Sequence, residues 1–533
     1  MSADSDSKKT TDVNVTNTNA KNGAVVEVFE EGSFEETSHF YEKTLSSSLS
    51  PTILSFLSMN PKQLVARFLH LNPSADPEQL KELVTHKPSW FHWAGADLFC
   101  TTDSQGERKM VLIETNSCPS GQKSMPTLAN NEFGGYYSLI RHTFYEIVRE
   151  RERSGELPKD GVLAVIYDKN KMEATGYAAV MAHIFKEKTY LVHSFKTETE
   201  PRVRFTDEGV MEVLLDSEDG SDKQTWTTVR AAFRYVTQKP WNRIPLFTKT
   251  FVFNPILACL AGGRNKLVAD KAYEMLNTQY SGSGLQINLP YTVRHVKLNE
   301  IPMWVENFGG FAVVKVPYGN AGQGVWTITS KQELDEFMTL SQDYNQFIVQ
   351  SLIGNYTWSS KAPTGHLYHL GTVPDKKNRI YVADLRMMVH FDADIGHWRP
   401  IAMYARRAEN PLLKDPPAPG KSWETLGTNL SVKLGEDKWT SDTSRLILMD
   451  QKNFHRLGLG IDDLINGYVQ TLMAAVSIDK MCSNLVDDKG NFNANLFRSI
   501  NPDAALLSEV MNFSSMEKEQ LEKQAAASSA TSS

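Results

Sequence analysis

The chain has few cysteines and no long apolar run, and each absence excludes a class of protein. Its four cysteines are scattered over 533 residues without C-x-x-C spacing. A disulfide framework or a zinc site is therefore not expected, and the chain suits a reducing compartment. The N-terminus lacks the apolar core of a signal peptide, and no stretch reaches the roughly 18 apolar residues of a membrane span. We predict a cytoplasmic protein with no membrane partner.

A strong excess of charge of either sign is also missing. The formal net charge is −7 and the isoelectric point is about 6.0, so nucleic acid and anionic membranes exert no general attraction. Hydrophobic residues make up 41% and charged residues 22%, which is typical of globular proteins. A chain of 533 residues can bury a large core and should contain more than one subdomain. We therefore expect no nucleic-acid partner, and the sequence also allows a homodimer.

The best-known nucleotide motifs are absent as well. No G-x-x-x-x-G-K-[ST] segment occurs, and no G-x-G-x-x-G segment follows a strand, so P-loop and Rossmann sites have no support. A Ser-His-Asp triad is not evident either. Any nucleotide chemistry must therefore come from other motifs.

The segment "ADLFCTTDSQGERKMVLIETNSCPSG" (residues 96–121) predicts a strand hairpin that carries oxygen ligands. Asp97 opens one apolar strand, and a second strand ends in the triplet E-T-N. Side chains two apart on a strand share a face, so Glu114 and Asn116 project together, and the hairpin places Asp97 beside them. Two carboxylates and an amide oxygen suit Mg²⁺. The alternative is an ordinary exposed strand end, since carboxylates are common on surfaces.

The segment "FAVVKVPYGNAGQGVWTI" (residues 311–328) predicts a second hairpin with a glycine-rich loop. Lys315 lies on its first, apolar strand, and Gly319, Gly322 and Gly324 lie in the loop. Successive backbone N–H groups of such a loop can surround a phosphate, and a lysine adds a point charge. A purely structural turn is the alternative.

Together with three later segments, these hairpins resemble the ATP-grasp superfamily. The segments are "FNPILACLAGGRNKLVADKAYEML", which contains Lys266, "QFIVQSLIG" and "YVADLRMMVHFD". The D…E-T-N motif precedes the lysines, as in the circularly permuted branch that includes glutathione synthetase and glutathionylspermidine synthetase. The resemblance covers residues 89–429 and implies a circularly permuted ATP-grasp fold of the α/β (α+β) class, with an associated α/β substrate domain. It also implies ATP and Mg²⁺ as cofactors.

The resemblance further implies a role for each motif. The lysines and the glycine-rich lid would bind the ATP phosphates, the hinge strand would pair with adenine, and Arg386 would steady the transferring phosphoryl group. The implied nucleotide contacts are Lys266, Lys315, Gly319, Asn320, Gly322, Gln323, Gly324, Gln350, Ser351 and Leu352, and the implied metal ligands are Asp97, Glu114 and Asn116. Two positions depart from the relatives: Gln350 stands where a Glu is frequent, and Gly95 stands where the glutathionylspermidine relatives have an Arg.

Further residues are candidates for binding the substrates. Arg234, next to Arg230 in "VRAAFRYVTQKPW", could clamp a substrate carboxylate, and a surface salt bridge is the alternative. Arg407 and Asn429, with Arg406, lie in a segment that resembles the loop closing the acceptor site of peptide-forming ATP-grasp ligases. Cys118 could be a nucleophile, but a small residue lining a crowded strand end fits better, because no His is near in sequence to activate it.

We expect four parts in the chain. The predicted parts are a disordered tail (1–25), an N-terminal region with helices, the metal hairpin and an α/β substrate domain (26–250), a nucleotide-binding region (251–513) and a second disordered tail (514–533). The pattern predicts helices within 40–84, 134–153 and 177–185, buried strands at 161–168 and 189–193, and a hairpin over 210–228.

The function that these residues and the resemblance imply is an ATP-dependent carboxylate–amine ligase. It would activate a small-molecule carboxylate as an acyl phosphate, join it to an amine such as an amino acid or small peptide, and release ADP and phosphate. A non-catalytic nucleotide-binding scaffold and a small-molecule kinase are the alternatives. A second possible metal pair, Asp479 and Asn501, lies where an unpermuted ATP-grasp protein would have its ligands, but Ser499 there replaces a carboxylate.

Overall fold

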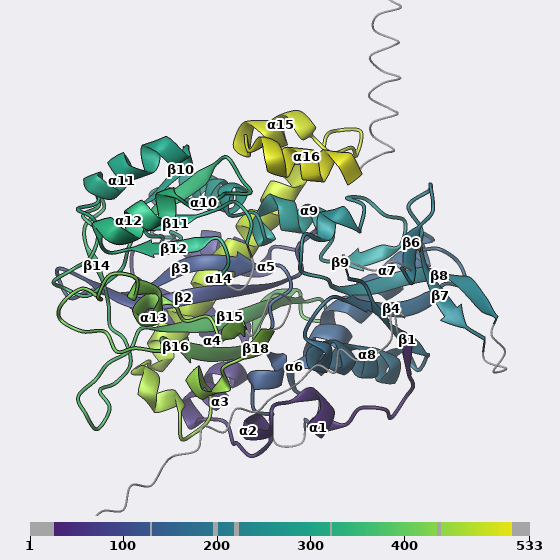
Figure 1. Cartoon of the computed structure of the whole chain (residues 1–533). Coiled ribbons are helices and arrows are strands. Elements are labelled where there is room, and N and C mark those ends of the chain that lie inside the picture. The colour runs from purple at the N-terminus through teal and green to yellow at the C-terminus, as the bar shows by residue number, and fades with distance from the viewer. Residues whose placement is uncertain are drawn as a thin grey trace, which may run out of the picture.

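The computed structural model describes residues 26–127, 131–195, 201–217, 223–319, 322–433 and 439–513 (Figure 1). The predicted tails and Asn320 lie outside these residues. The described chain has a mixed α/β fold built on three large sheets, as the predicted fold class requires. None of its described helices has both the length and the apolar character that a bilayer crossing needs.

One sheet, on the right in Figure 1, is mixed and corresponds to the predicted substrate domain. Its central strand β4 pairs in parallel with β5 and β8, and helix α8 (Lys171–Phe185) connects β4 to β5. The predicted strand–helix–strand unit is confirmed, with the helix beginning at Lys171 rather than at Tyr177. The predicted 210–228 hairpin is β7 and β8, and its turn lies outside the described residues. The strands of this sheet are β1 (Val26–Phe29), β4 (Val162–Tyr167), β5 (Thr189–His193), β6 (Val203–Phe205), β7 (Met211–Asp216), β8 (Gln224–Tyr235) and β9 (Phe251–Phe253).

A second sheet, at the upper left in Figure 1, has four antiparallel strands. The glycine-rich hairpin is confirmed, because β11 and β12 pair antiparallel with Lys315 opposite Val325. The predicted hinge strand is β13, which pairs with both β11 and β10. The elements here are β10 (Thr292–Val296), β11 (Ala312–Lys315), β12 (Val325–Ile328) and β13 (Phe347–Ser351), with α10 (Lys266–Gln279), α11 (Ile301–Asn307) and α12 (Lys331–Met338).

The third sheet lies between the other two in Figure 1 and contains the predicted metal hairpin. Strand β2 pairs with β3 on one side and with β15 on the other, although β15 lies almost 300 residues later in the chain. Helix α14 (Ile461–Asn484) packs closely on this sheet, since a Cβ on Gly467 would lie 3.2 Å from Leu98 Cδ1. The strands are β2 (Trp93–Asp103), β3 (Arg108–Asn116), β14 (Leu367–His369), β15 (Ala383–Asp392), β16 (His397–Arg407) and β19 (Leu446–Ile447).

Helices cover the outside of these sheets, and proline marks the start of several. Helix α4 begins at Pro61 after Asn60, whose side chain accepts a hydrogen bond from Gln63 N. The predicted helix at 134–153 forms as α6 and α7 joined by a π-helical stretch (Ile140–Tyr145). The flanking helices are α1 (Glu36–His39), α2 (Glu42–Leu45), α3 (Pro51–Ser58), α4 (Pro61–Leu71), α5 (Pro77–Thr85), α6 (Gly134–Leu139), α7 (Glu146–Ser154), α9 (Ile256–Ala258), α13 (Ser422–Leu426), α15 (Ala494–Ile500) and α16 (Ala504–Phe513).

Candidate functional site

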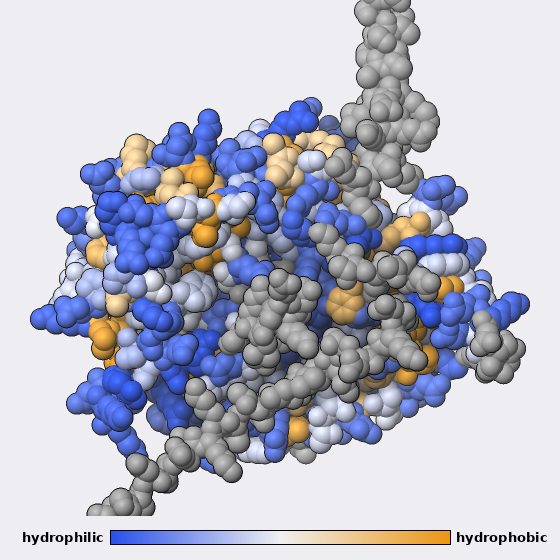
Figure 2. Space-filling view, in the orientation of Figure 1, coloured by the Kyte–Doolittle hydropathy of each residue, from blue (hydrophilic) through white to orange (hydrophobic). Residues whose placement is uncertain are grey.

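A deep cleft separates the four-stranded sheet from the sheet of β2 and β15. It holds about 1060 Å³ of empty space, counted out into the solvent at its open mouth. Figure 2 shows that most of the coloured surface on this face of the molecule is hydrophilic. Most residues predicted for nucleotide, metal and substrate line the cleft: Asp97, Glu114, Asn116, Lys266, Lys315, Gly319, Gly322, Gln323, Gln350, Ser351, Leu352, Arg386, Arg406 and Asn429.

The predicted metal hairpin forms in the expected register. Asp97 lies opposite Glu114 and Gly95 lies opposite Asn116, with a bulge after Asp97. The Asn116 Nδ2 atom is buried and has no hydrogen-bond partner among the described residues, although a buried amide normally has one. Two carboxylates, one amide oxygen and an unpaired amide donor therefore face the cleft, and these groups fit Mg²⁺ together with a phosphate.

Gly95 explains one departure from the relatives. A Cβ atom on this residue would lie 2.4 Å from Pro119 Cβ and 3.3 Å from Met388 Cγ. An arginine could not be accommodated here without moving Pro119. The segment that follows the metal hairpin therefore occupies the space that an arginine side chain would need.

Asp97 is already paired with two arginines. Arg386 donates from Nε and Nη2 to its two oxygens at 2.6 and 2.7 Å, and Arg406 Nη2 lies 2.9 Å from Oδ2. Arg406 also binds Asp384, with Nε 3.0 Å from Oδ1. Burial alone would raise the pKa of Asp97, but the two guanidinium groups outweigh it and hold that pKa well below its usual range. Asp97 thus stays ionised, and binding a metal requires exchange of an arginine partner.

The two predicted phosphate lysines face this group across the cleft. Lys315 Nζ donates to Gln350 Oε1 at 2.7 Å, and Lys266 Nζ lies 3.5 Å from Glu114 Oε1 and 3.3 Å from the Gly319 carbonyl oxygen. The pKa of Lys315 is lowered to about 8, chiefly by burial; Glu114 opposes this shift and Lys266 adds to it. Lys266 thus forms an ion pair with Glu114, whereas Lys315 contacts, among the described residues, only the neutral side chain of Gln350 and the Ile113 carbonyl oxygen and can bind an anion without displacing a carboxylate.

The glycine-rich loop takes a conformation that only glycine adopts readily. Gly322 and Gly324 have φ values of +81° and +69°. A Cβ on Gly324 would lie 2.2 Å from Val316 Cγ2, and one on Gly322 would lie 2.8 Å from Trp423 Cζ2. Trp423, at the start of α13, thus packs against the loop and lines the cleft. The two glycines are required here for both conformation and space.

The hinge strand lines the cleft, but two of its predicted backbone donors are in use. Ser351 N donates to the Tyr291 carbonyl at 2.8 Å, and Leu352 N donates to Ser360 Oγ at 2.7 Å. Gln350 points toward Lys315 rather than acting in place of the Glu of the relatives. Backbone pairing of adenine at these two N–H groups would need their present partners to move.

Three predicted arginines lie outside the cleft. Arg234 is fully buried and donates to the carbonyls of Asn254 and Val236, both at 2.7 Å. Arg407, adjacent to Arg406 on β16, points the other way and stacks on the Tyr381 ring at 4.6 Å. Their placement differs from the prediction because each guanidinium has a structural partner. Arg230 likewise pairs with Glu152 and Glu187.

The second possible metal pair does not form a site. Asp479 lies on α14, not on a strand hairpin, and its carboxylate accepts hydrogen bonds from the N–H groups of Ser89, Trp90 and Phe91 and from His86 Nε2. Burial raises the pKa of Asp479, and these donors lower it below its usual value. Asn501 instead accepts from Asn265 Nδ2 at 3.1 Å. The alternative metal pair therefore does not form among the described residues, because Asp479 and Asn501 bind other elements of the chain.

Cys118 is buried, and its thiol donates to the Arg234 carbonyl at 3.1 Å. Burial raises the pKa of the Cys118 thiol to about 11, although Arg234 and Arg264 lower it. This thiol is poorly suited to act as a nucleophile, as the sequence indicated.

The cleft residues that sequence reasoning missed include Arg264, Asp384 and Trp423. The first two stand two residues before Lys266 and Arg386, respectively. Asp384 lies on the same strand as Arg386, and equal spacing on a strand places both on one face. That period could have identified Asp384, whereas no local pattern indicates Trp423.

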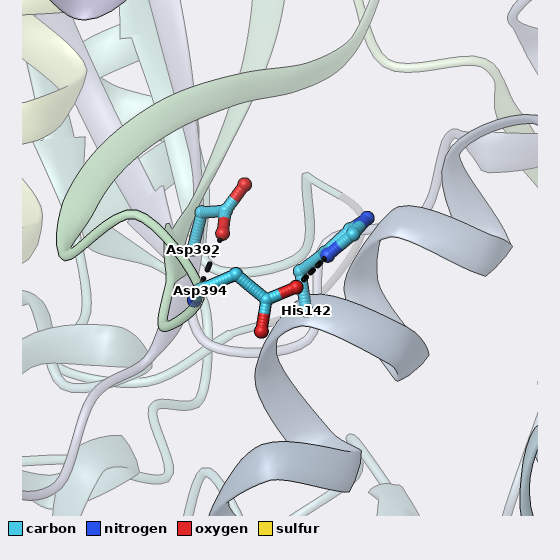
Figure 3. Close-up of side chains that lie close together, drawn as sticks. All are labelled: His142, Asp392 and Asp394. Carbon is cyan, nitrogen blue, oxygen red and sulfur yellow. Dashed lines mark hydrogen bonds and ion pairs between the residues drawn. The ribbon is translucent and has the colours of Figure 1, made fainter.

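A separate group of potential metal ligands lies outside the cleft. His142 on the π-helical stretch, Asp392 at the end of β15 and Asp394 in the following turn meet there, and His142 Nδ1 is 2.7 Å from Asp394 Oδ2 (Figure 3). Arg141 lies 3.6 Å from Asp394, and Arg399 lies 3.5 Å from Asp392. We assign no metal to this group, because two guanidinium groups already balance its carboxylates.

Comparisons with known proteins give distant structural likenesses. No protein-family model matches the chain, and no curated protein matches it. A glutathione synthetase-like effector from Globodera pallida is similar with a TM-score of 0.37 and 11% identity, over 68% of this chain and 86% of the effector. A RimK-domain ATP-grasp protein from Sphaerobacter thermophilus gives 0.26 and 12%, over 46% of this chain and 90% of that one.

N5-carboxyaminoimidazole synthetase from Staphylococcus aureus, complexed with ADP, gives a TM-score of 0.21 and 10% identity, over 46% of this chain and 70% of the synthetase. All three TM-scores lie below 0.5, so these likenesses do not assign the chain to a family. Circular permutation stays a prediction.

Proposed function

We propose that the protein is an ATP-dependent carboxylate–amine ligase that forms an amide through an acyl phosphate. The main support is the convergence of charges in one cleft: Asp97, Glu114 and Asn116 on one wall face Lys266 and Lys315 on the other. Phosphoryl transfer needs positioning and charge neutralisation, and these residue types supply both.

The residues of the cleft have distinct tasks in this reaction. Lys266 and Lys315 bind the nucleotide phosphates, and Gly319, Gly322 and Gln323 line the cleft beside them. Asp97, Glu114 and Asn116 would hold Mg²⁺, which would neutralise phosphate charge when bound. Arg386, now paired with Asp97, can turn to the transferring phosphoryl group and thereby release a carboxylate oxygen.

The reaction then runs in two steps. A carboxylate oxygen of the acid attacks the γ-phosphorus and ADP leaves, which gives an acyl phosphate. The amine nitrogen attacks the acyl carbon, inorganic phosphate leaves with the C–O bond electrons, and the nitrogen loses a proton. Asn429 and Trp423 line the mouth of the cleft beside the loop, where an amine could approach.

The test is to trap the activated acid. The protein is incubated with ATP, Mg²⁺, a panel of carboxylic acids and hydroxylamine, and we expect ADP and an acyl hydroxamate in equal amounts. A Glu114→Gln variant serves as the matched inactive control. ADP with a stable phosphorylated product and no hydroxamate would identify a kinase instead. Nucleotide binding without any ADP would identify a non-catalytic scaffold.

A further inference from the structure

Beside the cleft lies a second group of positive charges that the proposed reaction does not use. Lys169 lies two residues after the end of β4, where the charges of Arg264 and Arg386 act on it, and Lys123 lies in the short helical turn after the metal hairpin. Arg264 lines the cleft itself. These cations come from three separate elements of the chain.

The segment after the metal hairpin connects these cations in space. At one end, Arg264 Nη2 donates to the Cys118 carbonyl at 3.4 Å. At the other end, Lys123 Nζ donates to the side-chain oxygen of Asn170, the neighbour of Lys169, at 3.4 Å. In the middle, a Cβ on Gly121 would lie 2.4 Å from the Tyr404 ring.

Tyr404 links this segment to the arginines of the cleft, because its ring is 5.9 Å from both Arg386 and Arg406. Residues 118–123 therefore connect Arg264, which lines the cleft, with Asn170, the neighbour of Lys169.

One carboxylate acts on each lysine, and each carboxylate also accepts several hydrogen bonds. Burial lowers the pKa of Lys123, but Tyr41 and Glu173 outweigh it and raise that pKa, so Lys169 is the less satisfied of the two cations. Asp168 accepts hydrogen bonds from Thr237 N and Gln238 N at 2.9 and 2.7 Å, and it pairs with Arg243. The buried Glu173 accepts from the N–H groups of residues 121 and 122 and from two hydroxyl groups, those of Ser120 and Tyr235.

Within the described part of the chain, Lys169 has no hydrogen-bond or ion-pair partner. The pKa of Lys169 is lowered to about 8, chiefly by burial and also by Arg264, Arg386 and Lys123, while Asp168 opposes this shift. Cations that repel one another in a partly buried position are stabilised when an anion binds between them.

We propose that Lys123 and Lys169, with Arg264, form an anion subsite next to the cleft, and that the acid substrate carries a second anionic group that binds there. This inference rests on the proposed ligase function for its orientation: the first carboxylate reaches the phosphates while the second group, a carboxylate or a phosphate, contacts the two lysines. An acid with a single negative charge would leave the subsite empty.

The test measures binding to the full chain with Mg²⁺ and a non-hydrolysable ATP analogue by calorimetry. The probes are malonate, succinate, glutarate and 3-phosphonopropionate, each paired with a singly charged counterpart: the three monoamides, and propionate for the phosphonate. We expect at least one doubly charged probe to bind at least tenfold more tightly than its counterpart. A preference for a dicarboxylate indicates a carboxylate subsite, and a preference for 3-phosphonopropionate indicates a phosphate subsite.

Variants then locate the effect. Lys169→Gln and Lys123→Gln should each reduce that preference about tenfold and change the affinity for the ATP analogue less than twofold, and Lys169→Arg should retain the preference. Lys171→Gln is the matched control, because it removes the same charge two residues away, where the lysine pairs with Glu27 at 2.7 Å. If Lys123→Gln does not fold, the Lys169 variants decide.

The proposal is overturned if no doubly charged probe binds more tightly than its counterpart, or if the Lys169→Gln variant keeps that preference. It is also overturned if Lys169→Gln weakens binding of the ATP analogue as much as binding of the probe. Failure of the ligase function is separate. If singly charged acids give hydroxamate as efficiently as doubly charged ones, the ligase stands and the subsite falls. If doubly charged probes bind through Lys169 but no acid gives hydroxamate, the subsite stands and the ligase falls.

Discussion

The two walls of the cleft differ in how their charges are satisfied. On the wall of β2, β15 and β16, Asp97, Asp384, Arg386 and Arg406 are fully paired with one another. On the opposite wall, Lys315 contacts a neutral amide, and Lys266 is 3.5 Å from its nearest carboxylate oxygen. A phosphate can therefore bind the lysine wall directly, whereas the arginine wall must exchange partners. The ion pairs of β2, β15 and β16 stabilise the fold of the site, and Lys315 on the opposite wall can bind a ligand without breaking an ion pair.

The largest expected effect comes from breaking an ion pair on the wall of β2, β15 and β16, here called the paired wall. Arg406→Met leaves Asp384 without its guanidinium partner in a buried position, and removing one partner of a buried ion pair costs about 3–5 kcal/mol. Urea unfolding should show a loss of that size. Arg407→Met, one residue along the strand and outside the cleft, should cost less than about 1 kcal/mol. Equal losses in the two variants would contradict the assignment of the paired wall.

The second effect concerns function on the same side of the cleft. Glu114→Gln and Asn116→Ala should each lower Mg²⁺-dependent ADP formation at least about 100-fold, because they remove metal ligands. Their unfolding free energies should change little, since the Asn116 Nδ2 atom has no described partner to lose. Wild-type turnover in both variants, measured by ADP release over a range of Mg²⁺ concentrations, would exclude the hairpin as the metal site.

The third effect belongs to the lysine wall. Lys266→Ala and Lys315→Ala should each weaken ATP binding about tenfold or more, because a charged hydrogen bond contributes about 1.5–3 kcal/mol. Calorimetry with the ATP analogue measures this loss. Lys271→Ala on the exposed face of α10 is the control, since its partner is Glu274 and it does not line the cleft. Unchanged affinity in both test variants would contradict the phosphate assignment.

The smallest expected effect is a pH dependence of nucleotide affinity that arises from Lys315. The pKa of Lys315 is lowered to about 8 in the ligand-free protein, so its positive charge is present below that pH and is lost above it. Nucleotide affinity should fall as the pH rises from 8 to 9, by up to about tenfold, with proton uptake on binding. A Lys315→Arg variant should remove this dependence, because arginine stays protonated. An identical pH profile in that variant would count against Lys315.

The sequence predicted those features that depend on interactions between residues close in the chain, and it did not predict those that depend on contacts between distant residues. The β2–β3 and β11–β12 hairpins and the β4–α8–β5 unit follow from alternation and turn residues, which act locally. Which of the neighbours Arg406 and Arg407 points into the cleft depends on which face of β16 lines the cleft. The sequence of the strand alone does not determine that face. The structural role of Asp479 could not be predicted from the sequence, because its partners at residues 89–91 are almost 400 positions away.

The pairing of Asp97 with Arg386 also has a consequence for synthesis of the protein. The two residues are 289 positions apart, so at about 5–20 residues per second a ribosome needs roughly 15–60 s to deliver the second after the first. During that interval the metal hairpin has one unpaired edge and an uncompensated carboxylate. Nascent chains halted before residue 383 should therefore be the ones that bind chaperones, and those released after β16 should be able to close the sheet on their own.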